Sequence, residues 1–167
     1  MKISAHEEYG LRCLLAIGRH GRGESLTIPE IAATERLSIP YVAKLLRTLR
    51  QAGFVQSVRG KAGGYSLSQP ADQIAISDVM AALGGESVFS SDFCKRHPGR
   101  SSSCVHSTDC SLRSLWRKIH TAVESVLGRI TLQDLLRNEC EMSAWIAGSS
   151  TTTTSPVKQI VASPVSS

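Results

Sequence analysis

The sequence predicts a mainly α-helical fold with one small β-hairpin, followed by a long amphipathic helix. Residues 38–51 place apolar side chains at helical spacing, and a glycine follows shortly after. Residues 54–67 contain two short runs typical of β-strands around a glycine-rich turn. Residues 111–127 carry an apolar stripe over about five helical turns.

The overall charge favours an acidic partner. The chain has 167 residues, a formal net charge of +5 at pH 7 and an isoelectric point near 9.1. A basic protein of this size is typical of nucleic-acid binding first and of binding to anionic membranes second. No apolar run approaches the roughly 20 residues that span a bilayer, so we expect no membrane segment.

The amino-terminal sequence and the cysteine content predict a cytoplasmic protein. Acidic residues interrupt the region where a signal peptide would need a basic flank and an apolar core. In a reducing cytosol, five cysteines indicate metal or redox chemistry rather than a disulfide framework. The sequence contains no nucleophile elbow, phosphate-binding loop or H-E-x-x-H motif, so we do not expect an enzyme.

Three successive helices and a hairpin predict a winged helix-turn-helix. Ser4 is placed to cap the first helix, and Thr27 followed by Glu30 predicts a capping box at the start of a short second helix. After a brief turn, Ser38 is placed to cap the third helix. In a helix-turn-helix the later helix lies in the major groove and the earlier one braces it. We therefore predict a winged helix-turn-helix DNA-binding domain over residues 1–83.

The third helix and the hairpin are basic. Residues 36–71 contain six Lys or Arg side chains and no Asp or Glu. Basic residues on a helix often only face solvent, but the helix and turn directly upstream favour DNA binding here. We predict that residues 39–51 form a recognition helix whose buried face consists of Val42, Leu45, Leu46 and Leu49.

The predicted DNA contacts fall into three groups. Tyr41 and Lys44, near the start of the recognition helix, are placed to reach base edges. The side chains expected at phosphate or sugar are those of Ser38, Arg47, Thr48 and Arg50. At the wing tip we expect Arg59 and Lys61 in the adjacent minor groove, with Gly60 allowing a tight turn.

A second group of functional residues is predicted in residues 84–110, which are rich in Ser, Gly and Pro. This cysteine segment contains Cys94, Cys104 and Cys110, with His97 and His106 beside them. Thiolates on a flexible backbone can converge on a metal, and soft sulfur ligands select zinc or an iron–sulfur cluster. The spacing lacks the C-x2-C knuckle typical of structural zinc. The alternative is a loop with incidental reduced cysteines.

The apolar stripe of residues 111–127 predicts a dimerisation helix. A helix of this length after a small domain has more apolar surface than its own fold covers, although packing within one subunit is the alternative. Thr131 is placed to cap a short final helix, so we assign residues 111–138 to dimerisation. We expect residues 139–167 to form a disordered tail, because the sequence ends in a Ser- and Thr-rich stretch with almost no charge.

The chain resembles the winged-helix iron–sulfur transcriptional regulators of the IscR, NsrR and RirA type. The residues that carry the resemblance are EEYGLRCLLAI, LSIPYVAKLLRTLRQAGFVQSVRGKAGGYSLSQP, AISDVMAALGG, the three-cysteine segment and LWRKIHTAVESVLGRITLQDLL. They span about residues 1–138, and the wing sequence SVRGKAGGY is the most specific of them. The resemblance implies a homodimeric transcriptional repressor whose wings and recognition helices bind a palindromic operator in double-stranded DNA.

The same resemblance implies an iron–sulfur cluster held by Cys94, Cys104 and Cys110, through which iron, redox or nitric oxide status is sensed. IscR-like members have a histidine three residues after the third cysteine, but this chain has Arg113 there, which cannot ligate iron. NsrR-like members take an acidic residue from the amino terminus of the partner subunit, and Glu8 matches that position.

The resemblance therefore implies Glu8 as the fourth ligand, with His97 and His106 as local alternatives, and favours a 4Fe–4S over a 2Fe–2S cluster. Two alternatives lack a cluster. In one, a zinc ion is held by Cys94, His97, Cys104 and Cys110. In the other, the winged-helix regulator senses its signal through free thiols.

Overall fold

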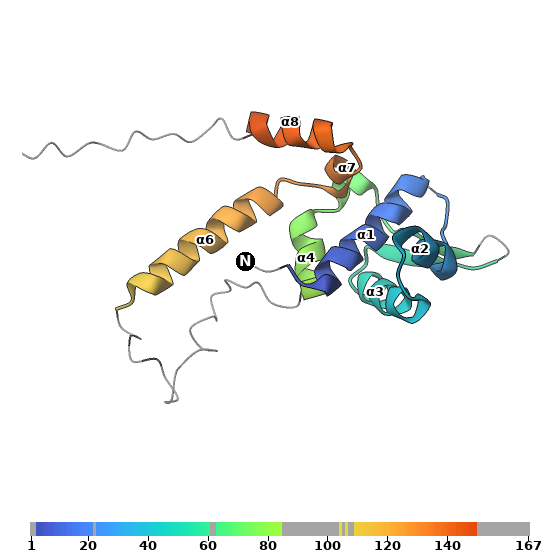
Figure 1. Cartoon of the computed structure of the whole chain (residues 1–167), viewed down its shortest axis with the longest axis horizontal. Helices are drawn as coiled ribbons and strands as arrows, with labels where there is room; N and C mark the ends of the chain where they lie inside the picture. Colours follow the sequence, from blue (N-terminus) through green and yellow to red (C-terminus); the bar gives the residue numbers. More distant parts are fainter. Residues whose placement is uncertain are drawn as a thin grey trace, which may run out of the picture. The chain divides into compact units, whose positions relative to one another are not determined.

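The structure is a computed structural model of the chain (Figure 1). It describes residues 3–21, 23–60, 63–84, 104, 106 and 109–149. The chain divides into two units, Met1–Leu136 and Arg137–Ser167. Every element that carries a predicted DNA contact belongs to the first unit.

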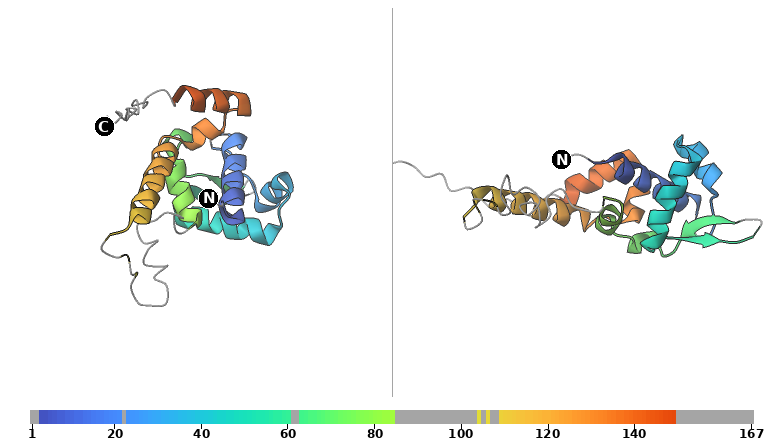
Figure 2. Two further views of the ribbon diagram at one scale, coloured as in Figure 1. Left: turned by 60° about the vertical axis from the view of Figure 1, so that its left-hand side comes forward. Right: turned by 90° about the horizontal axis from the view of Figure 1, so that it is seen from below.

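Three helices form the helix-turn-helix and its support: α1 (Ala5–His20), α2 (Ile28–Glu35) and α3 (Ile39–Gln51). The predicted cap of α1 is confirmed, because the Ser4 hydroxyl accepts from the Glu7 N–H at 3.2 Å and the Ser4 N–H donates to the Glu7 carboxylate at 2.7 Å. Thr27 and Glu30 form the same reciprocal capping box at α2. α1 packs against both α2 and α3 (Figure 2).

The start of α3 differs from the prediction in one respect. Ser38 occupies the N-cap, but its side chain makes no capping hydrogen bond. An N-cap side chain accepts from the second or third residue of its helix. Here the second residue is Pro40, which has no N–H, and the Tyr41 N–H donates to the Ser38 carbonyl at 3.1 Å. The Ser38 side chain is exposed instead.

The wing is an antiparallel hairpin of β1 (Val55–Val58) and β2 (Gly64–Leu67). Leu26, between α1 and α2, extends it through a bridge to Tyr65, with N–O distances of 3.0 and 2.8 Å. This close approach requires glycine at Gly64, because a Cβ there would lie 2.5 Å from the Leu26 carbonyl oxygen. The segment before α2 therefore holds the base of the wing.

Two further elements close the domain, η1 (Ala71–Gln73) and α4 (Ile76–Gly84). α4 lies close to α1, since Gly10 leaves room for Leu83: a Cβ on Gly10 would lie 2.5 Å from the Leu83 methyl carbons. Ala75, just before α4, forms an isolated bridge with Thr131. This bridge ties the end of the first unit back to the winged domain.

The core lies where α1, α2, α3 and α4 meet. The predicted buried face of α3 is confirmed, because none of its four apolar side chains has any exposed surface: Val42, Leu45, Leu46 and Leu49. The other helices and the segment before α4 add further fully buried side chains, among them Cys13, Leu14, Ile31, Ile74 and Val79. Burying a large aliphatic side chain stabilises a fold by about 1.5–3 kcal/mol, so this face fixes how α3 is presented.

The helix predicted after the cysteine segment is α6 (Ser111–Leu127), and the short α7 (Leu132–Leu135) follows it. No residue of α6 is buried. Three of its apolar side chains are 49–58% exposed: Leu112, Leu115 and Val126. The described part of the chain therefore covers the apolar stripe only in part, because Trp116, Ile119, Val123 and Leu127 are half-buried. α7 begins at Thr131, as predicted, through a capping box with Asp134.

The predicted tail is wrong at its start. Residues 139–149 form a helix, α8 (Glu139–Ser149), in the second unit. Its start is stabilised by Asn138: the Asn138 side-chain oxygen accepts from the Glu141 N–H at 2.9 Å, and the Asn138 N–H donates to the Glu141 carboxylate at 3.4 Å. The Ser- and Thr-rich composition that predicts disorder begins only where α8 ends, and residues 150–167 lie outside the described residues.

Candidate nucleic-acid interface and cysteine segment

The exposed face of α3 carries the predicted contacts of the recognition helix. Lys44 and Arg47 are exposed on the side opposite the buried face, and Arg50 is exposed on its flank. Gln51 is exposed on the same side as Lys44 and Arg47. Sequence reasoning missed Gln51 because it is uncharged, although its helical spacing from Lys44 and Arg47 is a usable signal.

Tyr41 and Thr48 lie on the other flank of α3, and both are half-buried. The Thr48 hydroxyl donates to the Lys44 carbonyl one turn earlier at 3.3 Å, so its remaining capacity is as an acceptor. The Tyr41 ring meets two rings of α1 edge-on, those of Tyr9 and His6. Neither His6 nor Tyr9 is predicted from the sequence, because the contact joins helices that are distant along the chain.

The described part of the wing tip presents one arginine. Arg59 is exposed directly after β1, and Gly60 follows it with a φ of 116°, in the region that only glycine adopts freely. The Gly63 N–H donates to the Gly60 carbonyl at 2.9 Å and closes the tip. A Cβ on Gly63 would lie 2.7 Å from that same oxygen. Lys61, the second predicted wing contact, lies outside the described residues.

An ion pair braces the two helices behind the recognition helix. Arg12 of α1 bonds the side chain of Glu35 at 2.8 Å and the Glu35 carbonyl at 3.0 Å. Its guanidinium also lies 5.5 Å from the centre of the Tyr9 ring. Hydrogen bonding to Glu35 raises the pKa of Arg12, whose guanidinium is protonated at all physiological pH values. α1 is thereby connected to the last residue of α2, directly before the turn into α3.

Part of the cysteine segment is described. Cys104 and Cys110 are half-buried free thiols, and Cys110 is the N-cap of α6 without a side-chain capping bond. Arg113, the residue that replaces a ligand of the IscR type, donates to the His106 carbonyl at 3.1 Å. This bond connects His106 to the first turn of α6. Cys94 and His97 lie outside the described residues.

The described donors suit soft metal chemistry, because thiolates are the usual ligands of iron–sulfur clusters and of structural zinc. Glu8 is exposed on the first turns of α1. Among the described residues, however, no three His, Cys, Asp or Glu side chains come together as a metal site. One subunit alone therefore does not bring Glu8 to Cys104 and Cys110.

Cys13 has a different character from the thiols of the cysteine segment. It has no exposed surface in the core, and burial raises its pKa to about 12. Reactive cysteines need an accessible thiolate. The sequence does not separate Cys13 from the other cysteines by motif, but its position on the apolar face of α1 does.

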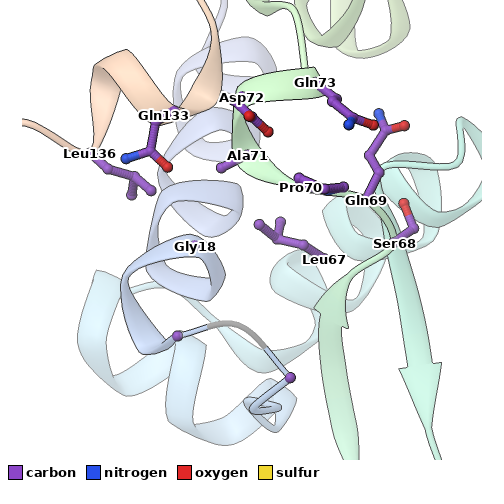
Figure 3. Close-up of a pocket in the computed structure, with 12 residues that line it drawn as sticks. Gly18, Leu67, Ser68, Gln69, Pro70, Ala71, Asp72, Gln73, Gln133 and Leu136 are labelled. Atoms are coloured by element: carbon purple, nitrogen blue, oxygen red, sulfur yellow. The ribbon is translucent and has the colours of Figure 1, made fainter.

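A groove of about 600 Å³ lies behind the wing, between the end of α1, the segment from Leu67 to Gln73, and α7 (Figure 3). Its lining combines apolar Leu67 and Leu136 with the amides of Gln69, Gln73 and Gln133. Among the described residues that line it, Asp72 is the only one with a charged side chain, and none is a predicted DNA contact or a cysteine. No described helix is long and apolar enough to cross a bilayer.

The chain matches a known protein family. Residues 3–138 match the Rrf2 family, which is described as an iron-dependent transcriptional regulator. The matched range includes the winged domain, the cysteine segment, α6 and α7.

Individual relatives cover the same range. The chain is 35% identical over 138 residues to the HTH-type transcriptional regulator IscR of Vibrio atlanticus, which covers 83% of this chain and 76% of that protein. It is 34% identical over 138 residues to protein rrf2 of Nitratidesulfovibrio vulgaris, covering 83% and 89%. Among solved structures, CymR, the global cysteine regulator of B. subtilis, superposes with a TM-score of 0.65 at 32% identity, covering 81% and 96%.

Proposed function

The chain belongs to the Rrf2 family of transcriptional regulators, and from that premise we propose that it is a homodimeric repressor that senses iron, redox or nitric oxide status through an iron–sulfur cluster. Its function as a DNA-binding transcriptional regulator follows from the family and the winged-helix fold. Such a regulator acts on cytoplasmic DNA, and none of the relatives named above is an enzyme by description.

The observation that carries the DNA-binding proposal is the exposed face of α3. Lys44, Arg47 and Arg50 are exposed while the opposite face is fully buried, so the helix can enter a groove without disturbing the core. Tyr41 and Lys44 contact base edges, and Ser38, Arg47, Thr48 and Arg50 contact the backbone. Arg59 and Lys61 enter the adjacent minor groove, with Gly60 between them. Two such surfaces in a dimer suit a palindromic operator.

The dimer proposal is supported by α6. Its stripe leaves Leu112, Leu115 and Val126 about half exposed in the single chain. A second copy that covers this stripe by a two-fold axis would give an assembly with two α3 helices related by that axis. The two recognition helices could then occupy half-sites one helical turn of DNA apart, roughly 34 Å.

In the proposed cluster site the ligands are Cys94, Cys104 and Cys110, with Glu8 of the partner subunit as the fourth. An acidic fourth ligand of this kind favours a 4Fe–4S cluster. Glu8, Cys104 and Cys110 form no metal site within the described residues of one chain, and the proposal therefore takes Glu8 from the partner subunit. A bound cluster would supply sensitivity to iron, oxygen or nitric oxide. The chain would respond by ordering the cysteine segment beside α6, so that ligand loss changes the spacing of the two recognition helices.

A second candidate lacks a cluster. One structural relative is described as a global cysteine regulator, and Cys104 and Cys110 are free half-buried thiols. These observations favour a regulator that uses zinc or the thiols directly. Metal and sulfide analysis of the purified protein distinguishes the candidates, because only the cluster contains acid-labile sulfide.

DNA binding is tested by selecting a preferred duplex from a random-sequence pool and titrating it beside a scrambled duplex. Arg47→Ala should weaken binding to both duplexes alike. It should also reduce the magnitude of the negative slope of log K against log salt by about two per dimer, because each phosphate contact contributes about 0.9.

Lys44→Ala should weaken binding to the selected duplex more than binding to the scrambled one, which reduces the ratio of the two affinities. Arg19→Ala, exposed at the end of α1, is the matched control. Selection of no preferred sequence would contradict the proposal.

A further inference from the structure

Three aromatic rings meet at the start of the recognition helix. The centre of the Tyr41 ring lies 6.0 Å from that of Tyr9, at an interplanar angle of 85°. It lies 6.3 Å from the His6 ring, at 63°. Both arrangements are edge-to-face, the geometry that aromatic pairs prefer. α1 therefore contacts the amino-terminal end of α3 through these rings, in addition to its contacts in the buried core.

This contact stands apart from the core that holds α3 in place. The core residues of α3, such as Leu45 and Leu49, have no exposed surface, whereas His6, Tyr9 and Tyr41 are all half-buried. A ring on the edge of a packed face can be truncated without opening an internal cavity. The cluster thus constrains the Tyr41 side chain rather than the backbone of α3.

Tyr9 also contacts a second residue, Arg12. The Arg12 guanidinium lies 5.5 Å from the centre of the Tyr9 ring, and Arg12 is fixed by two hydrogen bonds to Glu35, of 2.8 and 3.0 Å. The ring of Tyr9 therefore contacts both an anchored cation and Tyr41. This arrangement limits the orientations that Tyr9 can adopt, and through the edge contact those of Tyr41.

We propose that His6 and Tyr9 are positioning residues for Tyr41, so that α1 determines part of the DNA sequence specificity. The inference rests on the proposed function, in which Tyr41 contacts base edges. A side chain that is already held in its bound orientation loses less conformational freedom on binding. The benefit falls on the contact with one base pair, because phosphate contacts from Arg47 and Arg50 do not depend on the Tyr41 rotamer.

The test is the ratio of affinities for the selected and scrambled duplexes, measured together with the salt slope. Tyr9→Ala should lower the ratio roughly 2- to 10-fold, the range that an edge-to-face ring pair provides, and leave the salt slope unchanged. Tyr9→Phe keeps the ring and should restore the ratio. In a Tyr41→Ala background, Tyr9→Ala should have no further effect on the ratio. His6→Ala, in the first turn of α1 and outside the fully buried core, is a second variant and should also lower the ratio.

The outcomes separate the inference from the proposed function. If Tyr41→Ala lowers the ratio but neither Tyr9→Ala nor His6→Ala does, the positioning role is wrong and the base contact stands. If Tyr41→Ala leaves the ratio unchanged, both the base contact and the positioning role are wrong. If Tyr9→Ala weakens both duplexes equally and lowers the melting temperature, Tyr9 only stabilises the fold, which also overturns the inference.

Discussion

At the scale of single residues, the wing depends on glycines for two different reasons. Gly60 adopts a φ of 116°, which only glycine tolerates freely, and nothing lies near its missing side chain. At Gly64 the reason is space, because a Cβ would lie 2.5 Å from the Leu26 carbonyl oxygen. The sequence identifies both as turn residues, but it does not reveal the contact with Leu26, which belongs to another segment.

Gly64→Ala should therefore destabilise the fold by about 1–3 kcal/mol, because backbone atoms rather than a flexible side chain must move. Chemical denaturation measures the change in the free energy of unfolding. Gly148→Ala is the matched control, since nothing lies within 4 Å of its Cβ position and the residue is helical. Equal stability of the Gly64→Ala and Gly148→Ala proteins would show that Leu26 does not hold the wing.

Cys13 is predicted to be unreactive toward thiol reagents in the folded protein. In the native apoprotein at pH 7.5, iodoacetamide should label Cys104, Cys110 and Cys140 well before Cys13, because Cys13 is fully buried and its pKa is raised to about 12. Mass spectrometry of the digested protein measures labelling at each position. Rapid labelling of Cys13 before unfolding would contradict the packing of α1.

The raised pKa of Cys13 also determines how the free energy of unfolding changes with pH. An ordinary pKa of 9.0 in the unfolded chain and about 12 in the folded chain means that the thiol stabilises the fold fully below pH 9. That contribution is lost as the pH rises from 9 to 12. Cys13→Ala should therefore show a smaller alkaline loss of unfolding free energy than the wild type.

At the scale of elements, α6 stands out because contacts within one chain do not bury its apolar side chains. It has no buried residue, yet it follows an apolar period over its whole length. A helix of this pattern needs a covering surface, since exposed apolar area of this kind is typical of interfaces.

Leu115→Asp should convert the dimer to a monomer, because it places a charge in the stripe that a second copy covers. Sedimentation velocity at several protein concentrations measures the change. Thr121→Asp, an exposed position on the opposite side of α6, is the matched control and should remain dimeric. A wild-type protein that is monomeric at tens of micromolar, or a Leu115→Asp protein that is still dimeric, would contradict the role of α6.

Element by element, the sequence predicts helices well where the signals are local. Side-chain caps at Ser4, Thr27 and Thr131 start α1, α2 and α7, and the apolar period gives the buried face of α3. The prediction fails where backbone bonding replaces the local signal, as at Ser38. It also fails at α8, where the composition of the following stretch outweighs a local cap at Asn138.

At the scale of the whole molecule, the site is assembled from parts that the sequence keeps apart. The predicted contacts on α3 can be identified from charge and period, but the edge contacts of Tyr41 with Tyr9 and His6 cannot. The brace from Arg12 to Glu35 likewise joins two helices through a three-dimensional contact. Residue types and spacing predict which side chains take part; only the packing of α1 on α3 shows which of them act together.

The proposed cluster site extends the same principle beyond one chain. Glu8 lies on α1, Cys110 is the N-cap of α6 and Cys104 precedes that helix, and the three do not form a metal site within the described residues. If the site is completed across the dimer, ligand binding at the site and the spacing of the two recognition helices are coupled. Loss of a cysteine ligand should then change DNA affinity without altering any residue of the DNA interface.

The most direct test is therefore to purify the wild type and Cys104→Ala without oxygen, analyse both for iron, acid-labile sulfide and zinc, and titrate both with the selected duplex. We expect a visible absorption band with iron and sulfide in the wild type, their loss in Cys104→Ala, and a different affinity of the variant for the duplex. A colourless wild type with one zinc per chain, or equal affinities of the two proteins, would contradict it.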